Sequence, residues 1–265
     1  MKTKPRIASI IKANSLDFSS TGIRTFDLSE LHLATDLEFQ LPTNIRLGHL
    51  VEKIVSELIK ASTNYKVLYE NIQVVENKKT IGEIDFIIED KNTKQVIHME
   101  LAYKFYLFDP SISSEPINNW IGPNRNDSLQ EKLEKLKIKQ FPLLYHQLTK
   151  SKFTTVVIDE VSQALCLLVS LFIPYEYKGN FSPNYEKAVK GYYVSLETFM
   201  SLDHPSKTYY IPSKKEWGMD PSENEIWTHF DGVEKQITTS IQEKQALLCW
   251  QKHKDSYSTF FIIWW

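Results

Sequence analysis

Two acidic residues and a lysine fall on consecutive strand-like runs within GEIDFIIEDKNTKQVIHMELAYKFYL, which covers residues 82–107. Asp85 lies on the first run, and Glu100 and Lys104 lie on the second. Acidic residues are depleted in strands, so this pair needs a chemical reason. Two carboxylates on rigid strands suit a hard divalent cation such as Mg²⁺ or Mn²⁺, which takes oxygen ligands. Such an ion can polarise a phosphodiester and help to generate hydroxide from bound water.

The two runs form a predicted hairpin whose register is set by its apolar face. With the turn centred between Asn92 and Thr93, three apolar pairs face each other: Ile88 with Ile97, Phe86 with Met99, and Ile84 with Leu101. A slip of one residue would break all three pairs. The same register puts Asp85 opposite Glu100, where like charges about 4.5–5.5 Å apart destabilise the sheet. A shared proton, a basic side chain or a divalent cation could neutralise the pair; alternatively, this face is simply solvated.

The elements that position these residues follow from hydrophobic periodicity. Apolar residues at helical spacing predict a helix over residues 47–59. We expect strands at 66–75, 80–89 and 95–108, a helix at 128–140 that ends before Pro142, and a buried strand at 164–174. Beyond these we expect strands near 191–195, 207–211 and 258–265, a helix at 233–244, and a short helix near 28–37 in an N-terminal arm. This order predicts an α/β fold with an antiparallel start.

Composition places the chain among ordinary globular proteins. Its 265 residues are 42% hydrophobic and 24% charged, and its net charge is −2. The absence of a global basic field argues against a protein that coats nucleic acid through bulk electrostatics, although a local basic groove remains compatible. Cys166 and Cys249 stand among apolar neighbours and are expected to be buried thiols. We expect a cytoplasmic protein with no membrane segment, since the longest apolar run, FFIIWW, is too short to span a bilayer.

Several short motifs resemble a known family, and they occur in the same order. They are RLGHLVEKIVSELI (46–59), NIQV (71–74), GEIDFII (82–88), HMELAYKFYL (98–107), WIGPNRNDSL (120–129) and the QFPL that begins at Gln140. A carboxylate on one strand, with a carboxylate and a lysine on its hairpin partner behind an amphipathic helix, resembles the PD-(D/E)xK nuclease superfamily. The motifs together resemble a bacterial family labelled domain of unknown function 1853.

This resemblance implies a restriction-endonuclease-like core, a mixed central sheet flanked by helices, with an α+β C-terminal extension. The implied division of the chain is an N-terminal arm over residues 1–44, the nuclease-like core over 45–175, and the extension over 176–265.

The resemblance also implies roles for single residues. Asp85 and Glu100 would hold Mg²⁺ or Mn²⁺, and Glu52 on the first helix would match an additional acid near the metal. Lys104 would orient the attacking water and stabilise the transition-state charge. One departure matters: the usual lysine position is Ala102, and Lys104 lies about 13 Å along the strand from Glu100. An exposed helix-surface glutamate is the alternative for Glu52.

Gln140 would support the metal site, or else bond free carbonyls at a helix end. Lys132, Lys139 and Arg125 are candidates for contacts with nucleic acid, although a solvated helix face or a plain structural turn explains them equally. His98 could ligate a metal, but a partly exposed strand histidine is the expected role. The C-terminal tryptophans are expected in the core rather than stacked on bases.

The function that follows is a Mg²⁺-dependent nuclease that hydrolyses phosphodiester bonds in DNA or RNA. The alternative is a catalytically inactive module with the nuclease fold that binds nucleic acid or a protein partner.

Overall fold

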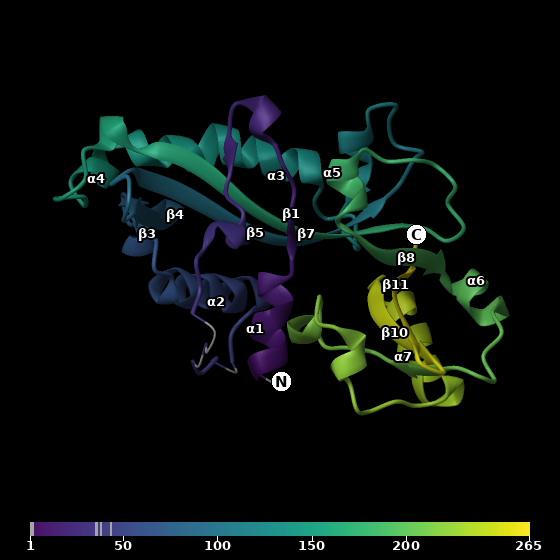
Figure 1. Cartoon of the computed structure of the whole chain (residues 1–265). Helices are drawn as coiled ribbons and strands as arrows, with labels where there is room; N and C mark the ends of the chain where they lie inside the picture. The colour runs from purple at the N-terminus through teal and green to yellow at the C-terminus, as the bar shows by residue number, and fades with distance from the viewer. Residues whose placement is uncertain (1–2, 35–36, 38, 43) are drawn as a thin grey trace. The chain divides into compact units, whose positions relative to one another are not determined.

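The structure is a computed structural model that describes residues 3–34, 37, 39–42 and 44–265 (Figure 1). It divides into two compact units. The site unit comprises Ser15–Tyr103 and Glu131–Leu168; the C-terminal unit comprises Met1–Asn14, Lys104–Gln130 and Val169–Trp265. The segments of the two units alternate along the chain. The reason is that two long strands, β5 (Val96–Phe108) and β7 (Ser162–Pro174), begin in one unit and end in the other.

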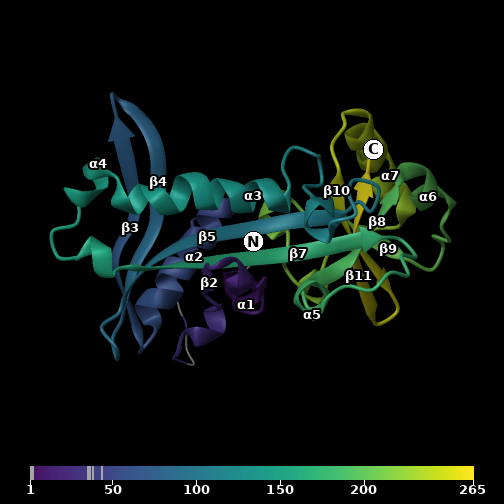
Figure 2. The same cartoon turned by 90° about the horizontal axis from the view of Figure 1, so that it is seen from above.

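The site unit combines a sheet with helices, and Figure 2 shows its strands from above. Strands β3, β4, β5 and β7 are hydrogen-bonded neighbours in that order, and the β3–β4 and β4–β5 pairs are antiparallel. Besides β5 and β7, the elements that lie wholly or partly in the site unit are β1 (Asn14–Ser15), η1 (Ser19–Thr21), β2 (Arg24–Thr25), η2 (Leu28–Glu30), α2 (Leu47–Ala61), β3 (Tyr65–Glu76), β4 (Lys79–Asp90), α3 (Leu129–Lys135), η4 (Leu136–Gln140), η5 (Phe141–Tyr145), α4 (Gln147–Lys150) and η6 (Ile158–Glu160).

The helix predicted over residues 47–59 is confirmed as α2, and the three strands predicted after it are confirmed as β3, β4 and β5. In α2 the apolar stripe is buried at Leu50, Val51, Ile54, Val55, Leu58 and Ile59, so its burial stabilises the helix against the rest of the unit. The β3–β4 turn is formed by Asn77 and Lys78, both at positive φ (48° and 62°). Positive φ at both central residues is what a two-residue hairpin loop of the favoured twist requires.

The helix predicted at 128–140 is wrong in detail. An α-helix, α3, is followed by the π-helical turn η4 and then by the 3₁₀ helix η5, so helical backbone continues past Pro142. Pro142 stands in the first turn of η5, a position at which proline is better tolerated than in the interior of an α-helix. The π-helical turn changes which way the residues after Lys135 point, and Gln140 is its last residue.

In the C-terminal unit, the sheet strands β8, β11, β10 and β9 are hydrogen-bonded neighbours in that order. Strand β8 is parallel to β7 and to β11, while β10 is antiparallel to β11 and β9. Its remaining elements are α1 (Thr3–Ile11), η3 (Pro116–Asn119), β6 (Trp120–Ile121), α5 (Pro183–Glu186), β8 (Val189–Ser195), α6 (Leu196–Ser201), β9 (Thr208–Tyr210), η7 (Lys214–Glu216), η8 (Pro221–Glu223), α7 (Phe230–Gln242), β10 (Leu247–His253) and β11 (Ser256–Ile263).

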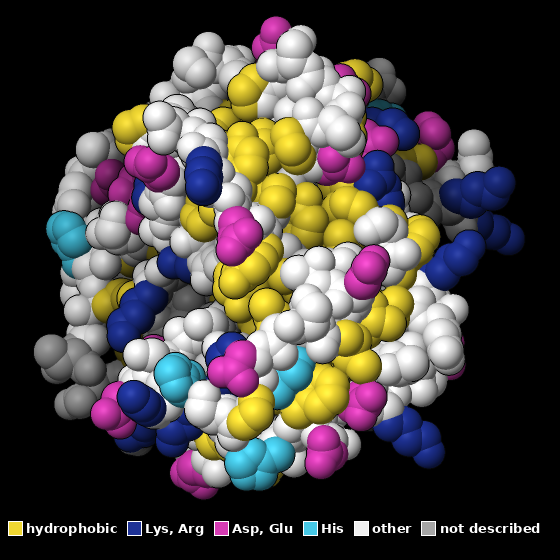
Figure 3. Space-filling model, turned by 90° about the vertical axis from the view of Figure 1, so that its right-hand side faces the viewer, with side chains coloured by type: hydrophobic (Ala, Val, Ile, Leu, Met, Phe, Trp, Pro, Cys, Tyr) yellow, Lys and Arg dark blue, Asp and Glu magenta, His cyan; other side chains and the backbone are white. Residues whose placement is uncertain are grey.

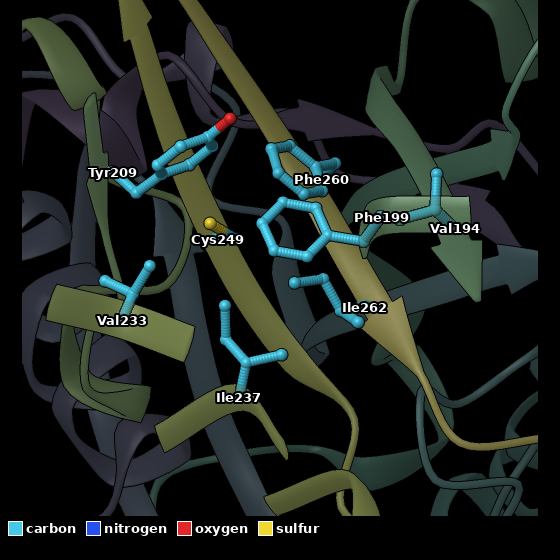
Figure 4. Packing of buried hydrophobic residues seen from close by; sticks show 8 residues of the cluster. All are labelled: Val194, Phe199, Tyr209, Val233, Ile237, Cys249, Phe260 and Ile262. Carbon is cyan, nitrogen blue, oxygen red and sulfur yellow. The ribbon is translucent and has the colours of Figure 1, made fainter. Parts of the chain in front are cut away.

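Helices α6 and α7 pack on this sheet through a buried apolar cluster (Figure 4). Its members come from both helices and all four strands: Val194, Phe199, Tyr209, Val233, Ile237, Cys249, Phe260 and Ile262. Cys249 and Cys166 are both free and buried, as expected. Figure 3 shows a face of the molecule on which apolar side chains gather, with acidic and basic side chains interspersed around them. A mixed surface of this kind produces no field of a single sign.

Three differences from the sequence expectations are local. Two elements of the structure, helix α1 and strand β10, are absent from the sequence prediction. Strand β10 contains the run LLCW, and a short continuous apolar run has no periodicity that distinguishes a strand from a helix. The helix expected at 28–37 is only the 3₁₀ turn η2, which Asp27 and Glu30 close with a capping box; residues 35 and 36 lie outside the described residues. In the described part of the chain, no helix is both long and apolar enough to cross a membrane.

Candidate functional site

The β4–β5 hairpin has the predicted register as far as its pairing extends, but the predicted pairs Asp85–Glu100 and Ile84–Leu101 lie beyond the last paired residues. Paired residues run from Glu89 with Val96 to Phe86 with Met99. Beyond that pair, the backbone N–H of Leu101 donates to Oδ2 of Asp85 at 2.8 Å. The Asp85 carboxylate is therefore fixed against the backbone of the residue that follows Glu100.

The face of β5 that carries Glu100 is buried. The exposed fraction of Glu100 is 1% and that of His98 is 0%. The alternative of a solvated face is therefore wrong for Glu100, and so is the expectation of a partly exposed His98. The cause is the helical run after α3: Gln140 contacts Glu100, and the ring of Phe141 packs edge-on against His98 at 5.6 Å between centroids.

Both oxygens of Glu100 accept a hydrogen bond. Oε1 lies 2.7 Å from Nε2 of His98, and Oε2 accepts from Nε2 of Gln140 at 3.2 Å. Gln140 also donates to the backbone carbonyl of Glu83 on β4 at 3.2 Å. The amide of Gln140 thus bridges the two strands that carry the acids. Buried carboxylates need such donors because an unpaired buried charge is strongly destabilising.

A second glutamine fixes the orientation of His98. Gln163, at the start of β7, donates through Nε2 to the carbonyl of Phe141 at 2.8 Å and lies 3.3 Å from Nδ1 of His98. Since a carbonyl only accepts, the amide group of Gln163 must face both partners with its N–H bonds. Nδ1 of His98 is then an acceptor, and Nε2 carries the proton that is donated to Glu100.

The environment of Asp85 opposes its negative charge. Burial raises the pKa of Asp85 well above its ordinary value, and the charge of Glu100 raises it further. The Leu101 N–H lowers the pKa, Glu52 on α2 raises it, and Lys132 on α3 lowers it. The structure thus brings Glu52 and Lys132 within electrostatic reach of Asp85. Glu52 also bonds His49 on its own helix at 2.9 Å.

Lys104 has a different partner from the one that the resemblance implies. Its Nζ donates to Oδ2 of Asp127 at 2.6 Å, and both side chains are about one-third exposed (36% and 39%). Both residues belong to the C-terminal unit. Ala102, at the usual lysine position, is buried. The lysine whose charge acts on Asp85 is Lys132, a candidate for nucleic-acid contact in the sequence.

Arg125 is held by neighbours within the C-terminal unit. Its guanidinium donates to Asp109 at 3.0 Å and lies 4.5 Å from the centroid of the Trp265 ring. Trp265 in turn donates to the carbonyl of Pro123 at 3.0 Å. Arg125 therefore joins the loop before α3 to the end of β11. Lys139, the third predicted nucleic-acid contact, is exposed.

Asp85 and Glu100 are the residues that could hold a divalent cation. Among the described residues, no group of three or more His, Cys, Asp and Glu side chains is arranged as a metal site. Two carboxylates still fit Mg²⁺, because this ion keeps several waters and is commonly bound by one or two protein carboxylates. Oδ1 of Asp85 makes no hydrogen bond to any described residue, so it is available as a ligand.

Sequence reasoning missed the role of two residues in this cluster. His98 stands two residues before Glu100, so both side chains lie on one face of the strand, and a buried H-x-E pair could have been read from that spacing. Gln163 is 65 positions away from His98 along the chain. Only tertiary folding brings them together, and the sequence carries no signal for that contact.

Comparisons with known proteins identify one family. A family model described as "Domain of unknown function (DUF1853)" matches residues 4–258. No curated protein and no solved structure matches the chain.

Proposed function

This chain belongs to the DUF1853 family, and we propose that it is a metal-dependent nuclease that hydrolyses phosphodiester bonds in DNA or RNA. The proposal depends on one observation: the buried carboxylate of Glu100 lies close enough to Asp85, whose pKa burial raises, for its charge to raise that pKa further. A divalent cation, Mg²⁺ or Mn²⁺, between them would remove the cost of this charge. When bound, such an ion supplies Lewis-acid activation of a phosphate and of its own water.

The residues around the two acids have roles that follow from their contacts. Gln140 and His98 hold the two oxygens of Glu100 through hydrogen bonds, which keeps the carboxylate in one orientation. Leu101 does the same for Asp85 through its backbone N–H. These contacts preorganise a binding site on two strands, which is more rigid than a site on loops.

Lys132 is the basic side chain that this proposal assigns to the reacting phosphate. It lies on α3, and its positive charge acts on Asp85, whereas Lys104 is paired with Asp127. A lysine beside the carboxylates would stabilise negative charge that develops on the phosphate in the transition state. Glu52 would add a third negative charge at the edge of the cation site.

Titration calorimetry with Mn²⁺ tests the cation site, and cleavage of labelled DNA and RNA in Mg²⁺ tests the reaction. We expect Asp85→Asn and Glu100→Gln each to weaken Mn²⁺ binding by at least about tenfold, because removal of even a supporting group has this effect. Glu89→Gln is the matched control, since Glu89 lies on the same strand as Asp85 but is paired with Lys66. An unchanged Mn²⁺ affinity in both site variants would contradict the proposal.

A second function has an observation in its favour. Both oxygens of Glu100 already accept hydrogen bonds, and Ala102 occupies the usual lysine position. These features favour a nuclease fold without turnover that binds nucleic acid or a protein partner. Binding of nucleic acid without cleavage in either Mg²⁺ or Mn²⁺ would select this alternative.

A further inference from the structure

The segment over residues 135–158 differs in charge from the rest of the chain. It contains five lysines and no aspartate or glutamate, although the whole chain has a net charge of −2. The lysines are Lys135, Lys137, Lys139, Lys150 and Lys152, and all five are exposed. We refer to residues 135–152, which carry them, as the basic segment.

The lysines of the basic segment lack acidic partners, unlike three lysines on α2 and β3. Lys53, Lys60 and Lys66 form ion pairs with Glu57, Glu70 and Glu89 at 2.8 Å, 2.8 Å and 3.0 Å. Within the described residues, none of the five lysines in the basic segment has an ion pair or a side-chain hydrogen bond. Five unneutralised charges within one exposed segment attract a polyanion.

Exposed apolar and aromatic side chains accompany these charges. Ile138 is 71% exposed, Tyr145 is 48% exposed and Leu148 is 37% exposed. A tyrosine ring that is half open to solvent between lysines is a surface on which a base can stack. Bases in a duplex are already stacked and paired, so only an unpaired strand can offer its base faces to such a ring.

The basic segment is continuous with the carboxylate cluster. Gln140 is part of it and donates to Glu100, and Phe141 contacts His98. Figures 1 and 2 both show α4 near β3, at the end of the helical run that begins with α3. A strand bound along this segment would therefore lead to Asp85 and Glu100.

We infer that the basic segment binds single-stranded nucleic acid, with its lysines on the phosphates and Tyr145 on a base. The inference deepens the proposed function by naming its substrate, and it rests on that function only for the cleavage step. Binding itself needs no metal ion.

Fluorescence anisotropy with a labelled oligothymidine strand of about 20 nucleotides tests the inference in the presence of EDTA. The test variant carries Lys135→Ser, Lys137→Ser and Lys139→Ser. We expect affinity to fall at least about tenfold at about 0.1 M salt, and the slope of log affinity against log salt to become shallower by about two. The control carries Lys53→Ser, Lys60→Ser and Lys66→Ser, which removes equal charge from paired lysines and should change affinity much less.

Tyr145 separates a single strand from other polyanions. Tyr145→Ala should weaken binding about tenfold, and Tyr145→Phe should restore it because the ring remains. Tighter binding of the matching duplex than of the single strand, or equal losses in the test and control variants, would overturn the inference; so would an absence of binding by the wild-type chain. A chain that binds Mn²⁺ but not the strand contradicts only this inference, and one that binds the strand but not Mn²⁺ contradicts only the proposed nuclease.

Discussion

Each unit contains a histidine whose two ring nitrogens both have hydrogen-bond partners, and the two clusters differ in their charge. In the C-terminal unit, His204 bonds the hydroxyl of Tyr209 at 2.8 Å and the carbonyl of Phe199 at 3.0 Å, and its ring stacks on Phe230. In the site unit, His98 bonds Gln163 and Glu100. Both rings use both nitrogens, so hydrogen-bond satisfaction alone does not distinguish them.

The two clusters differ in the charge of the groups that surround each histidine. The partners of His204 are neutral, so that cluster is complete and its role is structural. The partner of His98 is a carboxylate, and a second carboxylate, Asp85, lies close enough for its pKa to be raised. Excess buried charge of one sign is unfavourable unless something compensates it. A buried polar cluster therefore indicates a functional site when its charges, and not merely its hydrogen bonds, remain unbalanced.

The largest expected effect comes from His98→Ala. Glu100 would lose the donor at Oε1 while it remains buried, so the free energy of unfolding should fall by about 2–3 kcal/mol. If the carboxylates bind a cation, Mn²⁺ affinity should also fall by about tenfold, because His98 orients Glu100. Urea denaturation and calorimetry measure the two effects. His98→Gln retains an N–H donor and should recover part of both; no recovery would mean that only the volume of the ring matters.

Tyr209→Phe is the corresponding change in the neutral cluster. It removes one hydroxyl and leaves Nδ1 of His204 without its partner, which should lower the free energy of unfolding by about 1 kcal/mol. Mn²⁺ affinity should stay at the wild-type value. A large loss of Mn²⁺ binding in this variant would remove the distinction between a structural and a functional cluster.

The pH dependence of stability should differ in sign between the clusters. Because the pKa of Asp85 is raised in the folded chain, the folded state binds more protons than the unfolded state above the ordinary value of 3.8. The free energy of unfolding contributed by this group therefore falls as pH rises from 3.8 through the folded-state pKa. Asp85→Asn should abolish this slope in urea titrations without metal, and a slope identical to the wild type would contradict the assignment.

The smallest expected effect concerns His204, whose pKa is lowered by burial from its ordinary value of 6.5. Here the unfolded state binds more protons, so the free energy of unfolding should fall as pH drops through 6.5 toward the folded-state pKa. His204→Gln should flatten the dependence in that window. Urea titrations at several pH values compare the two proteins, and a dependence that persists unchanged in the variant would assign it to another group.

Part of the site could be predicted because it depends on local order. The register of the β4–β5 hairpin contains two of the three predicted apolar pairs, Ile88 with Ile97 and Phe86 with Met99. Just beyond them, Asp85 bonds the backbone of the residue after Glu100. The partners of the two lysines could not be predicted in this way. Lys104 donates a hydrogen bond to Asp127, which comes 23 residues later. The charge of Lys132, on the distant helix α3, lowers the pKa of Asp85.

The periodic features of this protein could be predicted from local patterns of residues: the helix over residues 47–59, the three strands after it, and the two acids on neighbouring strands. Periodicity is a local property, and burial of one face is enough to select it. Long-range packing set the rest: which side chains complete the cluster, the burial of the Glu100 face, and the alternation of the two units along the chain. Those outcomes depend on contacts between residues distant in the sequence, such as His98 with Gln163, for which neither propensity nor spacing carries information.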